Sequence, residues 1–298
     1  LRLASVSGMN PQRPCLLLIR GLGHSGTTIL DLALGAHPQV MGLGEAARIL
    51  ETPKPGEEAR GPAVLRGPGR RQRRCTCGET AVDCPIWGPA LDWLVTHEEW
   101  SLPDKMSQLM QLAAALPSSS GEPHRVLVDS FQDELELAQG MPEDVDVRVI
   151  HLVRDVRSWL HSRLKAARQS PQPLPEIRTL LRWWYVNRKF DRALQRCGRP
   201  VFRLGYEELA LQPERSLRLL CDWLGLAFSD QMLAPGAHST SHLLAGNRMR
   251  FDHDRSRAIS YDAAWMASHE WLIPAALFIP AVSALNRKLV YSNKLVDG

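Results

Sequence analysis

The sequence lacks any run of about 18 apolar residues, the length that a membrane-spanning helix requires. The longest apolar stretch, residues 273–285, is shorter and contains two prolines, so we expect it to belong to the core. The first residues also lack a charged segment followed by a long apolar run, the pattern of a secretory signal. We therefore expect no membrane span and a cytoplasmic location, although an anchor removed from the N-terminus would leave the same pattern. Residues 1–8 are interpreted as vector-derived residues before a natural start at Met9.

Cysteine is also scarce, and the two signs of charge are nearly balanced. Six cysteines in 298 residues are too few for a disulfide scaffold. The formal net charge of +4 suits anionic ligands but is too small to indicate a nucleic-acid partner. With 44% hydrophobic and 23% charged residues, the chain can bury one substantial core, so we expect a single domain over residues 9–298. The sequence leaves the oligomeric state open.

What the sequence does contain is an alternation of strand-like and helix-like segments. The short apolar runs that have the character of buried strands are residues 15–20, 125–129, 147–153 and 201–204. The segments with helical character are residues 27–36, 155–168 and 213–224. This alternation predicts an α/β fold, a P-loop-like three-layer α/β/α arrangement with a central parallel sheet. Residues 51–123 begin with a stretch rich in Pro, Gly, Glu and Arg and predict a loop-rich insertion.

A glycine-rich turn follows the first strand-like run and lacks the lysine of nucleoside-triphosphate enzymes. The turn is Gly21-Leu22-Gly23-His24-Ser25-Gly26-Thr27-Thr28, and Thr27 occupies the position of that lysine. Glycines allow backbone N–H groups to converge on an anion, the following helix adds its positive N-terminal end, and the threonine hydroxyls add donors. The sequence therefore predicts an anion site at Gly23, Ser25, Gly26, Thr27 and Thr28. A plain turn between a strand and a helix is the alternative.

The turn resembles the 5′-phosphosulfate loop of the sulfotransferase superfamily, whose core is Ser-Gly-Thr-Thr after an apolar strand, here Ser25 to Thr28. Further along, Gly44-Glu45-Ala46-Ala47-Arg48 is similar to the Gly-Glu-x-x-Arg segment of tyrosylprotein sulfotransferases and related bacterial enzymes. The resemblance implies an O-sulfotransferase that uses 3′-phosphoadenosine 5′-phosphosulfate (PAPS) and requires no metal. It makes Glu45 the catalytic base and Arg48 a substrate-binding residue. A carboxylate that only stabilises a helix start is the alternative for Glu45.

Three further segments carry the same resemblance. Arg154 at a strand end and Ser162 on the next helix are similar to the family's 3′-phosphate element. Tyr206-Glu207-Glu208-Leu209 resembles its segment near the adenine, and residues 242–251 resemble its nucleotide-closing loop. The resemblance implies that the nucleotide is bound by Arg154, Ser162, Tyr206, Asn247 and Arg250. An arginine that caps a helix and a tyrosine that packs at a strand end are the ordinary alternatives.

Two positions depart from the family pattern. His24 stands where many relatives carry arginine or lysine, so its catalytic role at the departing phosphate depends on its charge. The segment Asp129-Ser130-Phe131-Gln132 replaces the Asp-Ser-Ser-Lys of many bacterial relatives and therefore lacks a lysine. We expect leaving-group stabilisation to be weaker or pH-dependent. The missing cation must come from elsewhere, or the reaction must proceed without it.

Three of the cysteines lie close together in the sequence, at Cys75, Cys77 and Cys84. Three thiols and a histidine could form a tetrahedral zinc site, although the usual Cys-x-x-Cys spacing is absent. A disulfide and reduced packing cysteines are the alternatives, and the sequence does not decide among them.

Two other functions fit the same topology. A small-molecule or nucleotide kinase would need a loop lysine and a carboxylate for Mg²⁺, for which Asp129 is the candidate. A non-catalytic anion- or glycan-binding relative would keep the loop and lose the chemistry. The acceptor stays open among carbohydrate, peptide tyrosine and small-metabolite hydroxyls. An acceptor cleft could be lined by stacking of Trp183, Trp184 and Tyr185, and packing of these aromatics in the core is the alternative. His151, in mid-strand, is interpreted as a core histidine.

Overall fold

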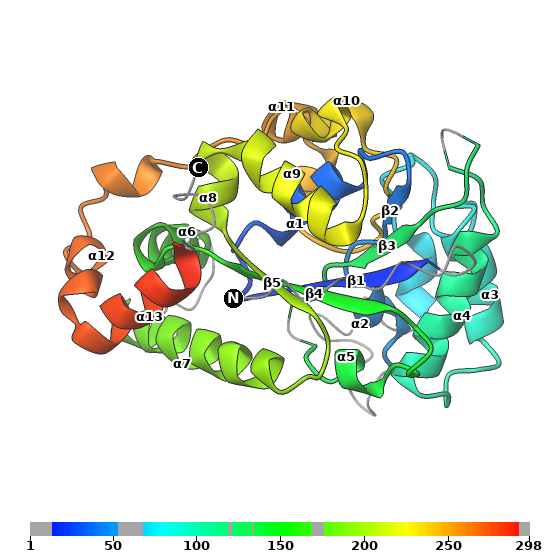
Figure 1. Ribbon diagram of the computed structural model, residues 1–298, viewed down its shortest axis with the longest axis horizontal. Helices are drawn as coiled ribbons and strands as arrows, with labels where there is room; N and C mark the ends of the chain where they lie inside the picture. The colour runs from blue at the N-terminus through cyan, green and yellow to red at the C-terminus, as the bar shows by residue number, and fades with distance from the viewer. Residues whose placement is uncertain (1–13, 53–67, 119–120, 133, 169–175, 292–298) are drawn as a thin grey trace.

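The computed structural model describes residues 14–52, 68–118, 121–132, 134–168 and 176–291. Its centre is a parallel five-stranded sheet in the order β2-β3-β1-β4-β5 (Figure 1). The strands are β1 (Cys15–Arg20), β2 (Val40–Gly42), β3 (Val126–Asp129), β4 (Val147–Val153) and β5 (Val201–Gly205). β1 pairs with both β3 and β4, so that Leu17 lies opposite Val128 on one side and Arg148 on the other. The predicted α/β fold with a central parallel sheet is confirmed.

Helices cover both faces of the sheet because β1 is apolar on both sides. Successive side chains of a strand point to opposite faces, so Leu16 and Leu18 enter one core while Leu17 and Ile19 enter another. The helices of the first core are α2 (Ala46–Leu50), α3 (Trp87–Leu94), α4 (Leu102–Ala114) and α5 (Leu137–Gly140). Those of the second are α1 (Thr27–Leu34), α8 (Tyr206–Leu211) and α9 (Pro213–Leu224), on the opposite face in Figure 1. The result is a three-layer α/β/α arrangement.

A third core lies beside the sheet, at the left in Figure 1. It contains Trp159 and Trp183 and is built by α6 (Val156–Arg168), α7 (Glu176–Gln195), α12 (Leu272–Ala275) and α13 (Pro280–Val290). The remaining helices are short: the α-helices α10 (Pro235–His238) and α11 (His253–Ser256) and the 3₁₀-helices η2 (Pro68–Gln72), η3 (Asp230–Leu233), η4 (Arg248–Phe251), η5 (Ala264–Ala267) and η6 (Ala276–Phe278). Among the described helices, none by itself has the length and apolarity of a membrane span, and one pair bent by 91°, Leu272–Phe278 with Pro280–Val290, reaches them only jointly.

The predicted loop-rich segment, residues 51–123, contains more helix than its composition indicates. Residues 53–67 lie outside the described residues, as do 1–13, and the rest of the segment includes α3 and α4. Ser101 caps the start of α4, because its hydroxyl accepts a hydrogen bond from the N–H of Asp104 at 3.3 Å. Trp87 and Met106 are fully buried in the first core. Apolar burial on one helix face therefore offsets the polar composition of this segment.

Candidate functional site

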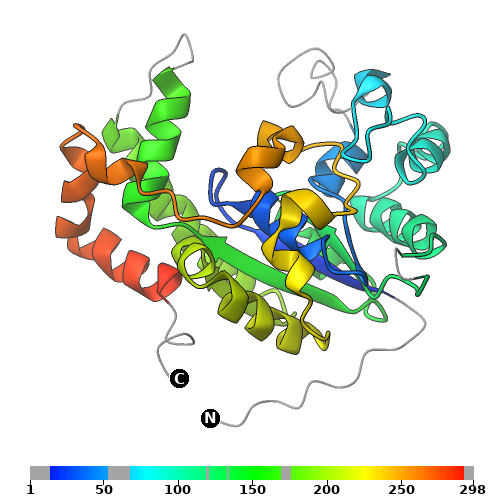
Figure 2. The same ribbon diagram turned by 90° about the horizontal axis from the view of Figure 1, so that it is seen from above.

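The segments that follow β1, β3 and β4 line a cavity of about 490 Å³. They meet because the carboxyl ends of parallel strands lie at the same edge of the sheet. The predicted site residues that line the cavity are Gly23, His24, Gly26, Thr27, Thr28, Glu45, Arg154, Ser162, Tyr206 and Asn247. In Figure 2 the orange segment after α11 crosses over the turn between β1 and α1, and residues 258–260 and 262 line the cavity there. Widely separated parts of the sequence therefore share one site.

The glycine-rich turn keeps its shape through backbone conformation and contacts from other elements. Gly26 has a φ of 93°, and a Cβ atom there would come within 2.5 Å of the Tyr206 ring. Trp159 Nε1 donates to the carbonyl oxygen of Gly23 at 2.7 Å, a contact that no local sequence signal indicates. Ser25 does not line the cavity, and its N–H donates to Leu22 O at 3.1 Å. α1 begins at Thr27, so the positive end of the helix faces the cavity.

Glu45 lies at the start of α2 with 7% of its surface exposed. One carboxylate oxygen accepts from Arg48 Nη1 at 2.5 Å and the other from Gln132 Nε2 at 3.5 Å. Gln132 Oε1 accepts in turn from Thr27 Oγ1 at 3.3 Å. Gln132 therefore connects the carboxylate to the glycine-rich turn, from the position where the sequence indicates only a missing lysine. Arg48 does not line the cavity, and its guanidinium lies 5.8 Å from the centre of the Phe131 ring.

Asp129 supports Glu45 from inside the core. It is completely buried, with one oxygen 2.8 Å from Arg20 Nη1 and the other accepting from the N–H of Ala47 at 2.8 Å. The second bond fixes the first turn of α2 and thereby the position of Glu45. Burial raises the pKa of Asp129, and the Arg20 charge opposes that rise. Because both oxygens are bonded and Asp129 does not line the cavity, it is not placed to bind Mg²⁺.

Arg154 is 6% exposed and is held on several sides. Its guanidinium donates to Ser158 Oγ at 2.9 Å, to His24 O at 3.3 Å and to Asp262 Oδ2 at 3.0 Å. It also lies 4.7 Å from the centre of the Tyr206 ring, whose hydroxyl donates to Ser260 O at 3.2 Å. The Tyr206 ring therefore lies against both Gly26 and Arg154.

Glu207, the residue after that tyrosine, orients the same arginine indirectly. Its carboxylate accepts from Ser158 Oγ at 2.7 Å and from the N–H of Asp155 at 2.9 Å. Burial raises the pKa of Glu207, and the hydrogen bonds that it accepts oppose that rise. The Tyr-Glu segment thus positions both the ring and the helix start beside Arg154. Sequence reasoning identified Tyr206 but missed the supporting roles of Ser158 and Asp262.

His24 is an unusual residue for its backbone position, with a φ of 74°. Its Nδ1 lies 3.3 Å from Ser162 Oγ, so the two predicted residues meet. Burial lowers the pKa of His24, and the positive charges of Arg163 and Arg154 lower it further. Because its pKa lies below the ordinary value of 6.5, His24 presents a largely uncharged imidazole to the cavity near pH 7.

A model of the sulfotransferase family matches residues 17–230, which include β1, the glycine-rich turn, Glu45, Arg154 and Tyr206. The chain belongs to the sulfotransferase family. Chicken (Gallus gallus) protein-tyrosine sulfotransferase 2 is 26% identical over 232 residues, 73% of this chain and 53% of the chicken protein. The chain thus spans about half the length of this curated relative.

Two solved structures share the fold of this chain, each at 18% identity and a TM-score of 0.52. One is the sulfotransferase domain of the Synechococcus PCC 7002 olefin synthase, with 98% of this chain and 99% of that domain covered. The other is the sulfotransferase domain of the curacin biosynthetic pathway, with 94% and 98% covered. At this identity the likeness supports the fold and no more.

The closing segment, residues 242–251, contacts the turn through Asn247. Its N–H donates to Thr28 Oγ1 at 3.4 Å, and its side-chain oxygen accepts from Met249 N at 3.0 Å. Arg250 does not line the cavity, because its guanidinium donates back to Gly246 O at 2.6 Å and Leu244 O at 3.4 Å. Burial lowers the pKa of Arg250 to about 10. Arg250 therefore holds the backbone of the closing segment.

Two further residues considered in the sequence analysis, His151 and Trp183, belong to the core. His151 is 1% exposed, and burial lowers its pKa to about 4, so it is a neutral core histidine. Trp183 is completely buried and donates from Nε1 to Arg154 O at 3.1 Å. Trp183 packs in the third core and does not line the cavity, as expected for a core residue rather than one that stacks on an acceptor.

Proposed function

We propose that the chain transfers a sulfuryl group from PAPS to an acceptor hydroxyl. The observation that carries this proposal is the cavity, in which the glycine-rich turn, Glu45, Arg154 and Ser162 meet from separate segments. An anion-binding helix start, a carboxylate and a buried arginine are the groups that sulfuryl transfer from a bisphosphate nucleotide needs. Membership of the sulfotransferase family supports the same reaction class.

In this reaction the acceptor oxygen bonds to sulfur while the bond from sulfur to the bridging phosphate oxygen breaks. The electron pair of that bond leaves with 3′-phosphoadenosine 5′-phosphate (PAP), and Glu45 takes the hydroxyl proton. A positioned base contributes about 10²- to 10⁴-fold to such a step. Gln132 and Arg48 hold the Glu45 carboxylate toward the acceptor from opposite oxygens. The buried bond from Ala47 to Asp129 keeps the helix start under Glu45 fixed.

The turn and the first residues of α1 hold the 5′-phosphosulfate. Neutral His24 donates a hydrogen bond to the departing phosphate, so leaving-group stabilisation depends on aligned donors more than on a cation at this position. Arg154 and Ser162 bind the 3′-phosphate. Because Asp262 pairs with Arg154 at 3.0 Å, the 3′-phosphate competes with this carboxylate for the guanidinium.

Two features of the cavity argue against a kinase on this topology. Thr27 stands where the phosphate-binding lysine would be, and none of the described residues that line the cavity is a lysine. Asp129, the candidate Mg²⁺ ligand, is buried in a bond with Arg20. A peptide tyrosine is the first acceptor to test, because the curated relative is a protein-tyrosine sulfotransferase. Carbohydrate and small-metabolite hydroxyls follow.

Calorimetric titration with PAP, beside ATP with Mg²⁺, tests the donor class. We expect PAP to bind, ATP with Mg²⁺ to bind more weakly, and Arg154→Ala to weaken PAP binding by about 10- to 100-fold, since a hydrogen bond to a charged group contributes roughly 1.5–3 kcal/mol. The matched control is Arg71→Ala, because Arg71 pairs with Asp92 at the surface and does not line the cavity. A preference for ATP with Mg²⁺ would overturn the proposal in favour of a kinase.

A further inference from the structure

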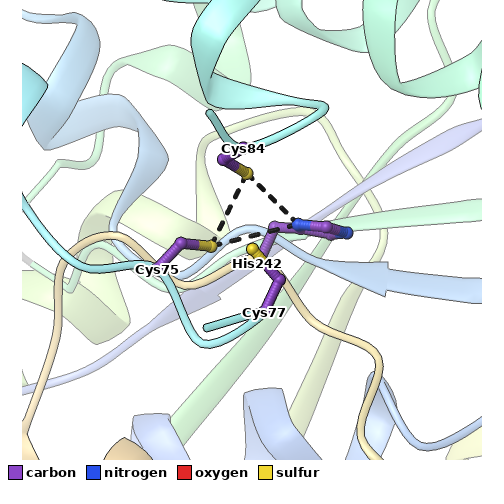
Figure 3. Close-up of side chains that lie close together, drawn as sticks. All are labelled: Cys75, Cys77, Cys84 and His242. Atoms are coloured by element: carbon purple, nitrogen blue, oxygen red, sulfur yellow. Dashed lines mark hydrogen bonds between the residues drawn. The ribbon is translucent and has the colours of Figure 1, made fainter. Parts of the chain in front are cut away.

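Cys75, Cys77, Cys84 and His242 converge on one point outside the cavity (Figure 3). The three cysteines come from the segment between η2 and α3, and the histidine comes from the start of the closing segment. Their sulfur and ring nitrogen atoms all lie within 4.8 Å of one another. None of the four lines the cavity, so the sulfuryl-transfer site does not account for them.

Three distances within this Cys–His cluster are close to the edges of a tetrahedral metal centre, and the others do not exceed 4.8 Å. Zn–S bonds of about 2.3 Å and Zn–N bonds of about 2.0–2.1 Å give tetrahedral edges of about 3.8 Å between sulfurs and about 3.6 Å between sulfur and nitrogen. Cys84 Sγ lies 3.7 Å from Cys75 Sγ and 3.3 Å from His242 Nδ1. Cys75 Sγ lies 3.9 Å from the same nitrogen. One imidazole nitrogen thus faces the sulfurs at ligand spacing.

The two alternatives to a metal site, a disulfide and simple packing of the cysteines, leave part of the cluster unexplained. All six cysteines of the chain lie within the described residues and are free thiols. A disulfide between Cys75 and Cys84 would use two sulfurs and leave Cys77 and His242 beside them with no function. Packing accounts for buried Cys75 and Cys84 but not for the exposed Cys77, which turns toward the others.

Hydrogen bonds hold the ligands of the cluster in place from both segments. Cys75 N–H donates to Glu79 O at 2.9 Å and Gly78 N–H donates to Cys75 O at 3.1 Å, which forms a tight turn around Cys77. Gly78 has a φ of 96°, a conformation that glycine adopts without strain. On the other side, Trp87 Nε1 donates to His242 O at 2.7 Å. Hydrogen bonds within the protein therefore hold the turn and the backbone of His242 in place without a metal ion.

A second residue joins the two segments directly. Thr76 Oγ1 donates to Ser241 O and accepts from the N–H of Leu243 at 2.9 Å, so it bonds to both neighbours of His242. Cys77 is exposed, which gives an ion a route to the cluster from solvent. Preorganised ligands with an entry route are what a protein metal site requires.

We propose that Cys75, Cys77, Cys84 and Nδ1 of His242 bind a structural Zn²⁺ ion. Binding forms three Zn–S bonds and one Zn–N bond, and the three thiol protons pass to solvent. Four protein ligands complete the tetrahedron and leave no position for water or substrate, which makes the site structural rather than catalytic. The ion joins the 73–88 segment to the first residues of the closing segment.

The metal content of the purified full chain tests the proposal. We expect elemental analysis to find one zinc ion per chain and Cys77→Ser to reduce zinc affinity by about 100-fold or more, because even ligand-orienting residues contribute about 10- to 100-fold. Cys77→Ser is the informative variant because this side chain is exposed and its loss does not disturb the core. The matched control is Cys197→Ser, whose thiol donates to Leu194 O at 3.1 Å and has no contact with the cluster. It should keep one zinc.

Cobalt substitution adds a readout that is independent of both activity and folding yield. Metal-free protein titrated with Co²⁺ should develop the visible absorption of a tetrahedral thiolate complex, and zinc should displace it. Cys77→Ser should lose this absorption while its far-ultraviolet circular dichroism stays that of the wild type. If the metal-free chain bound neither Zn²⁺ nor Co²⁺, or if peptide mapping found a Cys75–Cys84 disulfide in the purified protein, the proposal would be wrong. Neither outcome depends on sulfuryl transfer.

Discussion

Glu45 and Gln132 show which site residues a sequence motif can predict and which it cannot. The Gly-Glu-x-x-Arg segment identified Glu45, which lines the cavity. The sequence indicated only that position 132 lacks the lysine of many relatives, yet Gln132 is hydrogen-bonded to both Glu45 and Thr27. Asp262 gave no signal, because it acts on Arg154 from 108 positions away in the sequence. Local motifs indicate residues that line the cavity but not the partners that folding brings to them.

Glu45→Gln keeps the size of the side chain and removes its capacity to take a proton. We expect the rate of sulfate transfer from PAPS to fall by about 10²- to 10⁴-fold while PAP affinity stays within about twofold, because the proposed mechanism places Glu45 at the acceptor rather than at the nucleotide. Transfer of radiolabelled sulfate and calorimetry measure the two quantities. Glu214→Gln, at an exposed pair with Arg218, is the control. Equal turnover by Glu45→Gln and wild type would remove Glu45 from the mechanism.

Whole elements were predictable where a run of apolar residues was long enough. The 15–20 run is β1 to the residue, and the 147–153 run is β4. β2 was missed because three residues carry too little periodicity. α3 and α4 were hidden in a polar segment, since their helical character depends on burial against the first core. The sheet order likewise came only from the structure, because register is set by pairing between distant segments.

The glycine-rich turn allows a prediction at the level of the element. Gly26→Ala places a methyl group within 2.5 Å of the Tyr206 ring, so the turn must shift relative to α8. We expect PAP binding to weaken by about tenfold or more, because backbone donors that bind an anion lose their alignment. Calorimetry checks this outcome.

Gly198→Ala separates that clash from backbone strain. Gly198 has a φ of 69°, a similar left-handed conformation, but a Cβ atom there would have nothing within 4 Å. Both variants therefore lose about 1 kcal/mol or more of stability from the backbone, whereas only Gly26→Ala should lose nucleotide affinity. Equal nucleotide affinity in the two variants would show that the turn tolerates the shift.

Over the whole molecule, Asp155 joins the start of α6 to the C-terminal helix. Its carboxylate accepts from Arg157 Nε at 2.9 Å, from Asn286 Nδ2 at 3.0 Å and from the Tyr291 hydroxyl at 2.9 Å. Burial acts to raise the pKa of Asp155, but the hydrogen bonds from Arg157 and Asn286 outweigh it, and the pKa is lowered. Asp155 adjoins Arg154, so this contact also fixes the edge of the cavity.

Asp155→Asn should destabilise the fold by about 3 kcal/mol or more near pH 7, because it leaves an amide among donors in a buried network. A lowered pKa means that the contribution is present above the ordinary carboxyl value of 3.8 and is lost as the pH falls through the lower folded value. The stability difference should therefore shrink below about pH 3.8, as urea unfolding at several pH values would measure. Asp254→Asn, at an exposed pair with Arg257, should change stability by less than about 1 kcal/mol. A pH-independent difference would contradict this account.

The contact between Thr76 and the residues beside His242 can form only late in synthesis, because it joins distant parts of the sequence. Cys75 leaves the ribosome 167 residues before His242. At a synthesis rate of about 5–20 residues per second, His242 emerges roughly 8–33 s after Cys75. β3, β4 and β5 all emerge within that interval, so the sheet can assemble first. The closing segment is thus a late addition in biogenesis, and three neighbouring thiols stay open to oxidation until it arrives.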